Sequence, residues 1–506
     1  MRTYLTPLIQ LQRLFIPALL CLFVWAAWRM VVQKDRAVGL VLYISLVVIV
    51  DAYLNTGLYL PGLEKGSIRY SEICAAFLLF SPGPTGTQRS LSRAVTWPLG
   101  LYFGLLFFSA MRSDPIWKSL LEFRRVALPQ IVAFLIAKRG LESSEAYRRF
   151  FMHLTTLVII IAVFTFWDLF FDRVILKSDM LENGIYWFNR AQNRFGSFFL
   201  NPNYLAAFIV LVFPSAFVWT LNEHGLWPRL FAWAGLLALI FALVETQSRA
   251  PLLAFGIALV ILIVGPCGGV SRKRRAGVLT LFVVLLAIVM PGSYDHAVKR
   301  FGDDSLAREM STENGRSRET TWMFTGRMIA DHPVIGIGFG EAQFTKFMDA
   351  YGFAEQYGIQ SLDAPHNSYL QAAVYAGIPA LALFLIANAG LLGRAAWISV
   401  RGAPEKDPSV VFGIGVGITG FLVCIYTDLQ LFTMNAAPVY WVFFGLLLSL
   451  VAPAVQPAAE RRQLATVALR PSLTSASVVH LHSRLRGSAS APVLRPERGV
   501  PASRRT

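Results

Sequence analysis

The sequence predicts an all-α fold: a polytopic bundle of about 12 to 13 transmembrane helices with one long extramembrane loop that contains short helices. Two observations on the whole chain support this prediction. Of the 506 residues, 55% are hydrophobic and 15% are charged, and the mean hydropathy is +0.53. Apolar stretches close to the ~20 residues that cross a bilayer recur from end to end. This pattern excludes a soluble enzyme, a disordered chain and a secreted protein with one cleaved signal.

Thirteen apolar segments are candidate spans, in the order 15–32, 38–54, 70–82, 94–111, 126–137, 151–171, 202–221, 229–246, 250–266, 276–292, 367–392, 409–428 and 434–452. Two of them, 70–82 and 126–137, are short for a full crossing, so we expect re-entrant or tilted pieces there. The four cysteines lie in or beside apolar segments without CxxC spacing, which argues against a disulfide framework and a zinc ribbon.

Basic residues in short loops indicate the orientation of the spans. The run Ser271–Arg275 carries four basic residues between two strong spans, and such loops stay in the cytoplasm. Alternation then puts three regions on the outer face: residues 172–201, the turn at 246–250 and the long loop 293–366. Counting back through all the segments puts the amino terminus outside, against the basic residues near it, Arg2 and Arg13. We interpret this conflict as one early segment that is not a span.

The outer loop 293–366 is the only sizeable extramembrane region that the sequence predicts. It carries seven Lys and Arg against eleven Asp and Glu, a net charge of −4. Residues 320–330 alternate apolar and polar side chains at helical spacing before Pro333, which predicts an amphipathic helix on the membrane surface. The following Gly336 to Gly340 reads GxGxG and matches neither nucleotide-binding fingerprint, so we interpret it as a tight turn packed against helices.

The chain therefore divides into five parts. Transmembrane helices occupy 1–171, and transmembrane helices with arginines at their outer ends occupy 172–292. The outer loop 293–366 and the C-terminal transmembrane helices 367–452 follow. The tail 453–506 carries nine Arg against two Glu, so we expect it to be disordered and to face anionic cytoplasmic lipid. Loops and tail thus account for the net charge of +16, and nucleic acid is not an expected partner.

Few ionisable residues lie at the rim of a span, where an unpaired charge is costly. Arg194 precedes the span at 202–221, and Arg249 lies in the turn between two spans. Each of these arginines, taken alone, is as readily a snorkelling anchor bound to lipid phosphate. His366 begins the run His366-Asn367-Ser368, where the outer loop meets the next span, and an imidazole there can accept a proton.

Other chemistries lack their motifs. The outer loops contain no HExxH, no Cys/His pairs and no compact Asp-x-Asp, with Asp303-Asp304 the nearest approach, so a metal site is not expected. No G-x-S-x-G elbow supports a serine hydrolase. Arginines with one histidine on an outer membrane face suit an anionic, lipid-anchored substrate, because guanidinium groups match phosphate oxygens.

Taken together, these motifs resemble the bacterial O-antigen ligase and O-antigen polymerase superfamily. The resemblance covers about residues 190–395 and rests on Arg194 to Asn203, Ser248-Arg249, Arg318 to Trp322, Asp331 to Gly340 and His366 to Leu370. It implies an integral glycosyltransferase of the bacterial inner membrane. Such an enzyme moves a glycan from undecaprenyl diphosphate to a sugar hydroxyl on the periplasmic side, without a metal, a cofactor or a nucleotide sugar.

The resemblance also implies roles for individual residues. Arg194, Arg249 and, less directly, Arg318 would hold the diphosphate and stabilise it as the leaving group. His366 would deprotonate the acceptor hydroxyl, and attack opposite the diphosphate would invert the anomeric centre. Supporting roles fall to three polar residues: Asn203, Asp363, which would orient His366, and Asn367.

The acceptor stays open at this point. A ligase transfers onto lipid A core, a polymerase onto the growing glycan, and related enzymes onto a protein hydroxyl. A transporter or flippase for lipid-linked glycan is the alternative from another class, because arginines in a bundle also mark a pathway. The lack of obvious inverted repeats and the acidic loop that ends in a histidine favour the enzyme. The expected partners are the lipid-linked glycan, an acceptor glycan or lipid A core, and membrane lipids.

Overall fold

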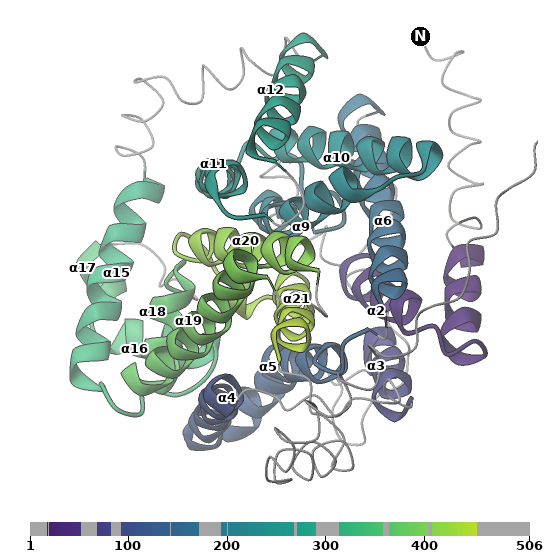
Figure 1. The fold of residues 1–506 in the computed structure, drawn as a ribbon. Coiled ribbons are helices and arrows are strands. Elements are labelled where there is room, and N and C mark those ends of the chain that lie inside the picture. The colour runs from purple at the N-terminus through teal and green to yellow at the C-terminus, as the bar shows by residue number, and fades with distance from the viewer. Residues whose placement is uncertain are drawn as a thin grey trace, which may run out of the picture. The chain divides into compact units, whose positions relative to one another are not determined.

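The apolar segments of the sequence form helices joined by turns (Figure 1). The computed structural model describes residues 18, 20–51, 68–81, 93–141, 143–171, 194–199, 201–267, 271–289, 313–357, 364–402 and 407–452, and these contain helices and no strand. All of them lie within one unit, Met1–Pro453. The predicted all-α class is therefore confirmed.

The helices follow one another along the chain with short connections. Those of the first half are Leu20–Val31, α2 (Arg36–Ser45) with its π-helical continuation η1 (Leu46–Val50), α3 (Tyr70–Phe80), α4 (Arg93–Arg112), α5 (Ile116–Ala137), α6 (Ser144–Phe171), the 3-10 turn η2 (Ser197–Phe199), α9 (Pro202–Asn222) and α10 (Leu226–Thr246). Those of the second half are α11 (Arg249–Val264), α12 (Arg272–Val289), α15 (Glu313–Asp331), α16 (Glu341–Ala350), α17 (Phe353–Tyr357), α18 (Ser368–Ala376), α19 (Ile378–Arg401), α20 (Pro408–Cys424), the 3-10 turn η3 (Gln430–Phe432) and α21 (Ala436–Val451).

Among the described residues, five helices are long and apolar enough to cross a bilayer, namely α4, α6, α9, α10 and α19. Shorter apolar helices, including α11, α20 and α21, accompany them. Large apolar side chains such as Trp97 on α4 and Leu253 on α11 are exposed, as expected of a surface that lies in lipid. The chain is thus a multi-pass membrane protein.

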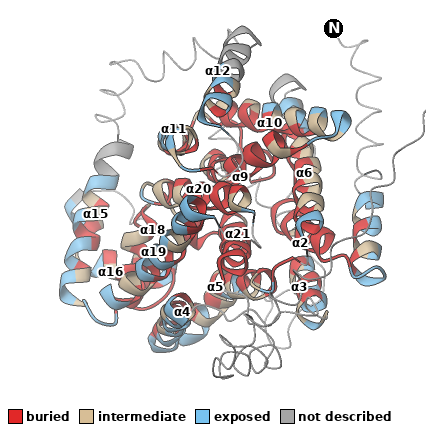
Figure 2. Cartoon of the chain, viewed as in Figure 1, coloured by how far each residue is buried: buried red, intermediate tan, exposed pale blue. Residues whose placement is uncertain are grey.

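The centre of the bundle is formed by α9, α20 and α21, which are buried along nearly their whole length (Figure 2). The most extensive helix contact is between α9 and α20. Gly413 and Gly417 of α20, spaced as GxxxG, allow it: a Cβ at Gly413 would lie 2.9 Å from the Cα of Ser215, and one at Gly417 would clash with the carbonyl of Leu211. This contact fixes the end of α20 beside the start of α9.

Two predicted spans differ from the structure. Segment 126–137 is not a short piece but the second half of α5, a helix of 22 residues, because Arg124 in its first half pairs with Glu72 of α3 at 3.0 Å. The predicted single span 367–392 is wrong, since the chain breaks at Gly377 into α18 and α19. Gly377 has φ +87, and a Cβ there would overlap the carbonyl of Val334, so only glycine fits.

The outer-loop predictions agree with the structure where it is described. Residues 320–330 lie within α15, which is longer than predicted. The glycine run that follows is a tight turn: Gly336, Gly338 and Gly340 all have positive φ, and the N–H of Ile337 donates to the carbonyl of Val374 in α18 at 2.8 Å. Segment 70–82 is the short helix α3, as expected. The tail 453–506, and Arg2 and Arg13, lie outside the described residues.

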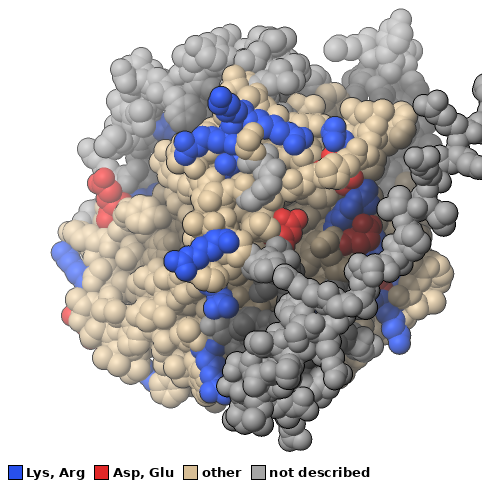
Figure 3. Space-filling view, in the orientation of Figure 1, with Lys and Arg blue, Asp and Glu red and all other residues tan. Residues whose placement is uncertain are grey.

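The helices give the bundle two distinct ends. Helix α9 starts at Pro202 and runs for 21 residues, a rise of about 30 Å. Directly after it, the carboxylate of Glu223 accepts hydrogen bonds from Arg148, near the start of α6, with Nε at 2.9 Å. Helix α11 likewise ends at Val264, whose carbonyl accepts from Arg272 at 2.9 Å. Figure 3 shows basic side chains gathered over α12 and beside α6 on the face that it displays.

Candidate functional site

A polar cavity of about 260 Å³ lies where the starts of α9, α11 and α15 meet the turn after α20. It is called the arginine cavity below, and its lining consists of Arg194, Asn203, Arg249, Ala250, Pro251, Arg318, Thr427, Asp428 and Gln430. All three arginines that the sequence predicted as diphosphate-binding residues therefore face one cavity. They come from three separate segments of the chain, so only the fold brings them together.

Arg194 is held by three acceptors at the ends of α9 and α10. Its Nε donates to the carbonyl of Thr246 at 3.3 Å, and its Nη2 donates to Asn203 Oδ1 at 2.7 Å and to Ser248 Oγ at 3.1 Å. The arginine is half-buried rather than spread on the surface. This fixed geometry is more typical of a binding group than of a snorkelling lipid anchor, which keeps its head group in water.

Arg249 reaches the cavity because of a sharp turn between two helices. Gln247 ends α10 in the left-handed conformation, with φ +47, and Ser248 precedes the first residue of α11. Arg249 is that first residue, so its side chain lies at the amino-terminal end of a helix, where the backbone itself favours an anion. Cavity and helix end thus provide positive potential at the same point.

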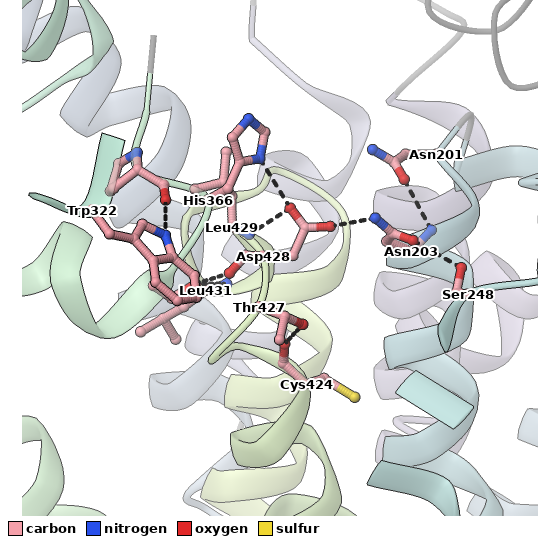
Figure 4. A network of polar contacts seen from close by, with 12 residues as sticks. Asn201, Asn203, Ser248, Trp322, His366, Cys424, Thr427, Asp428, Leu429 and Leu431 are labelled. Atoms are coloured by element: carbon pink, nitrogen blue, oxygen red, sulfur yellow. Dashed lines mark hydrogen bonds and ion pairs between the residues drawn. The ribbon is translucent and has the colours of Figure 1, made fainter. Parts of the chain in front are cut away.

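Asn203 joins the arginines to an aspartate that the sequence analysis did not identify. The Asn203 side chain accepts from Arg194 and from Ser248 Oγ (2.8 Å), and its Nδ2 donates to Asp428 Oδ2 at 2.6 Å (Figure 4). The side chain of Asn201 caps the start of α9 and accepts from the Asn203 N–H at 2.9 Å. Asn203 is therefore a bridge with both ends of its amide occupied.

Asp428 is the acidic partner of His366. The carboxylate Oδ1 lies 3.5 Å from His366 Nδ1, and the Asp428 side chain is only 6% exposed. Burial by itself raises the pKa of Asp428, but the contacts with His366 and the Leu429 N–H and the charge of Arg318 outweigh it and hold that pKa below the ordinary aspartate value. The carboxylate is consequently ionised at neutral pH and can stabilise a protonated imidazole.

Asp363, the predicted orienting residue, lies outside the described residues, whereas Asp428 occupies that position in the structure. A signal for Asp428 was present in the sequence. It is the last residue of the apolar segment 409–428, and a charge at the rim of a span requires a partner or a function. Its partner was not evident because His366 lies in a different segment.

His366 is held in an unusual backbone conformation. Its φ is +50, and the preceding carbonyl of Pro365 accepts from Trp322 Nε1 of α15 at 2.7 Å. The second ring nitrogen points away from Asp428 (Figure 4), and the side chain is 31% exposed. A non-glycine residue with positive φ is a strained conformation that clusters at functional sites. One nitrogen is thus oriented by the carboxylate and the other is open to a ligand.

Asn367 and Ser368 support this arrangement without lining the cavity. The side chain of Asn367 accepts from the N–H groups of Tyr369 and Leu370 and so caps the start of α18. The hydroxyl of Ser368 donates to the carbonyl of Asp428 at 2.8 Å, which ties α18 to the turn after α20. The predicted supporting role of Asn367 is therefore that of a helix cap.

The arginine cavity also contains a polar group that has no partner. Gln430 is fully buried, and neither its Nε2 nor its Oε1 has a hydrogen-bond partner among the described residues. Buried amides are normally paired, so this side chain is available to a polar ligand. The sequence analysis did not identify it.

The chemistry of the cavity is that of an anion site with an acid–base group beside it. Three guanidinium groups face one carboxylate, and the carboxylate is paired with an imidazole. Within the part of the chain that the structure describes, no three His, Cys, Asp or Glu side chains are grouped to hold a metal ion. Asp303 and Asp304 lie outside that part. His332, by contrast, packs its ring against Phe347 with centroids 5.5 Å apart.

Comparison with known proteins identifies the family. None of the curated proteins searched matches the chain. The family model described as O-antigen ligase matches residues 234–385, a segment that includes Arg249, Arg318 and His366 and leaves Arg194 outside. The chain is therefore a member of the O-antigen ligase and O-antigen polymerase superfamily, whose members are membrane enzymes that act on lipid-linked glycans.

Proposed function

We propose that the protein is a metal-independent glycosyltransferase that moves a glycan from undecaprenyl diphosphate onto a sugar hydroxyl, as an O-antigen ligase does. The observation that carries this proposal is the continuous set of contacts Arg194–Asn203–Asp428–His366 across the arginine cavity. It joins a group suited to a diphosphate to a group suited to a proton. A reaction that expels a diphosphate and deprotonates a hydroxyl needs both.

The arginines have the leaving group as their substrate. The guanidinium groups of Arg194, Arg249 and Arg318 converge on a cavity of about 260 Å³, and guanidinium groups bind phosphate oxygens through paired, charge-assisted hydrogen bonds. As the bond between the anomeric carbon and the phosphate oxygen breaks, negative charge grows on the diphosphate. Donors that are already in position stabilise this charge without reorganisation.

His366 has the acceptor as its substrate. The ring nitrogen that points away from Asp428 takes the proton of the acceptor hydroxyl, and the hydroxyl oxygen forms the new bond to the anomeric carbon. The electron pair of the broken bond leaves with the diphosphate. Asp428 stabilises the imidazolium that results, and the 3.5 Å contact shortens as the imidazole gains its charge. Attack opposite the leaving group inverts the anomeric centre.

The periplasmic face is the location that we propose for this chemistry. The arginine cavity is at the end of the bundle where α9 and α11 begin, and the basic residues Arg148 and Arg272 are at the ends of the same helices furthest from it. Basic residues of short loops stay in the cytoplasm, which supports an outward-facing cavity in the inner membrane. A donor already carried across the membrane would reach it from the outer leaflet.

One experiment with purified components separates the enzyme from a transporter. Detergent-solubilised protein, given undecaprenyl diphosphate glycan and an acceptor, is expected to release undecaprenyl diphosphate without ATP, nucleotide sugar or divalent metal. Full activity in EDTA supports leaving-group stabilisation by arginine. Dependence on added magnesium contradicts it and points to Asp303 and Asp304. No release with any acceptor, together with movement of the carrier across reconstituted vesicles, favours a flippase, because a flippase needs two compartments.

The acceptor is identified in the same assay. Transfer to lipid A core supports the ligase form that we propose. Chain extension on a second lipid-linked glycan, with no transfer to lipid A core, supports the polymerase form, which uses the same residues and the same chemistry. Both outcomes retain the arginine and histidine roles.

A further inference from the structure

A second polar cavity, of about 240 Å³, lies near the amino-terminal ends of α2 and α6. It is called the Asp35 cavity below. Four basic residues line it, Arg29, Lys34, Arg36 and Arg149, against the single acidic residue Asp35. Such an excess of positive charge in a concave site favours an anion.

The Asp35 cavity is at the end of the bundle furthest from the arginine cavity. Asn203 lines the arginine cavity at the start of α9, and Glu223, directly after the end of α9, pairs with Arg148. Arg149, the next residue after Arg148, lines the Asp35 cavity. About 30 Å of helix therefore separates the two cavities, which is the thickness of the hydrocarbon core. The substrate site described above cannot include both.

The basic groups of the Asp35 cavity are not all occupied by one another. Arg29 donates to Asp35 at 2.6 Å and Arg149 lies 3.5 Å from the same carboxylate oxygen, so two guanidinium groups share one negative charge. The Nε atoms of Arg29 and Arg149 are buried and make no hydrogen bond within the described chain. Arg36 instead donates to the carbonyls of Leu78 and Ile136, at the ends of α3 and α5. Arg29 and Arg149 thus remain under-neutralised.

An apolar groove continues from this cavity into the membrane. It has a volume of about 510 Å³ and is lined by α2, α6, α10 and the helix Leu20–Val31. The helical spacing joins it to the Asp35 cavity: Trp25 of the groove is one turn before Arg29, and His153 is one turn after Arg149. Trp25 contacts both sides, with Arg29 over its ring at 5.6 Å and the His153 ring at 5.7 Å.

The groove has the depth of one membrane leaflet. Along α6 its lining extends to Ile160, which is 11 residues beyond Arg149, or about 16 Å of helix. Half of the ~30 Å hydrocarbon core is about 15 Å. Tryptophan at the boundary between the polar and apolar parts is typical of the membrane interface.

We propose that the Asp35 cavity and the apolar groove together form a binding site for one anionic phospholipid of the leaflet opposite the arginine cavity. The phosphate lies between Arg29 and Arg149, and an acyl chain lies in the groove beyond Trp25. Charge complementarity selects an anionic over a zwitterionic head group, because Asp35 neutralises only part of the basic cluster. The groove selects a lipid over a free phosphate, since only a lipid fills both parts.

The test uses native mass spectrometry of the full-length protein in detergent, with dioleoyl phosphatidylglycerol or dioleoyl phosphatidylcholine added after delipidation. The unmodified protein is expected to retain one phosphatidylglycerol and to prefer it to phosphatidylcholine. The double variant Arg29→Gln/Arg149→Gln should bind phosphatidylglycerol about tenfold more weakly, or less. The matched control is Lys273→Gln/Arg274→Gln, which removes two exposed charges near the start of α12 and should change nothing.

A variant of opposite sign separates lipid binding from a loss of folding. Asp35→Asn keeps a side chain that can cap α2 but removes the only carboxylate of the cavity, so phosphatidylglycerol binding should become tighter. Weaker binding in both the arginine variant and Asp35→Asn would mean that the cluster is only structural, and would overturn the proposal. Glycerol 3-phosphate should not displace the bound lipid. Displacement by it, or by inorganic phosphate at equal concentration, would identify a free-phosphate site instead.

Filling the groove tests the acyl-chain half of the proposal. Thr156→Phe places a large ring among the groove residues of α6, on a side chain that is only partly buried. We expect it to lower phosphatidylglycerol retention while leaving the charge cluster intact. Unchanged retention would overturn the assignment of the groove. Release of undecaprenyl diphosphate by these variants is measured separately, since none of the residues lines the arginine cavity.

Discussion

Asn203 donates a hydrogen bond of 2.6 Å to Asp428, a residue 225 positions away along the chain. The same amide accepts from Arg194, so it lies between the group proposed to bind the diphosphate and the group that orients His366. The start of α9 is therefore not only a lining of the arginine cavity but the connection between its two functions.

We expect Asn203→Ala to weaken both functions together. Loss of a hydrogen bond to a charged group costs about 1.5 to 3 kcal/mol, which is about ten- to a hundredfold in activity. Donor KM should rise as Arg194 loses an acceptor, and kcat should fall as Asp428 loses a donor. Asn222→Ala, at the other end of α9, is the control and should behave as the unmodified protein. A change in KM alone would mean that Asn203 acts only through Arg194.

We expect His366→Ala to abolish glycan transfer while the protein is still made and inserted. Its role is proton transfer, which contributes about a hundredfold to ten-thousandfold, and its side chain is partly exposed rather than part of the core. His332→Ala is the control, because that ring only packs against Phe347. Activity of His366→Ala at the level of the control would remove the histidine from the mechanism.

Asp428→Asn should keep the contact with Asn203 but lose the charge that stabilises an imidazolium. We expect kcat to fall about a hundredfold or more, with donor KM changed far less, and with a shifted dependence of kcat on pH. Asp428→Glu should restore part of the activity. The control is Asp407→Asn at the opposite end of α20, where aspartate caps the helix and asparagine caps equally well. An unaltered pH profile in Asp428→Asn would assign Asp428 to packing.

Lysine should not replace Arg194 or Arg249. An arginine binds two phosphate oxygens at once and Arg194 also holds three protein acceptors, whereas lysine is a point charge. Weaker use of the lipid-linked donor is the expected result, measured as a rise in its KM of about tenfold or more. Arg272→Lys, exposed near the end of α11, serves as the control. Full activity of both site variants would make lipid anchoring the better explanation.

The orientation can be tested in cells with a permeable outer membrane. A cysteine at Ser311, in the predicted outer loop, should react with an impermeant thiol reagent, and one at Ser271, in the basic turn, should react only after lysis. Cys21→Ser is the background for both, because Cys21 is the only exposed cysteine of the described chain. The reverse pattern of labelling would invert the topology and move the arginine cavity to the cytoplasm.

The candidate site shows how far a linear pattern reaches. Arg194, Arg249 and His366 were predicted because each is a charged or titratable residue beside an apolar segment, which is a local property. The pairing of His366 with Asp428 was not predicted, since it depends on how α18 and the turn after α20 are joined, through Ser368 and the Asp428 carbonyl. Gln430 carries no charge and no motif, and only its burial without a partner distinguishes it.

The fold shows the same division. Hydropathy determined the class and most of the helices, because the cost of exposing polar backbone to lipid requires helices wherever an apolar segment crosses. Hydropathy did not determine the break at Gly377, where φ +87 and the carbonyl of Val334 depend on the glycine turn of the outer loop packing against α18. The sequence by itself thus determined which segments lie in the membrane and which residues carry charge. The tertiary structure decided which of those residues meet, because contacts between distant segments depend on close helix packing such as that of Gly417 on α9.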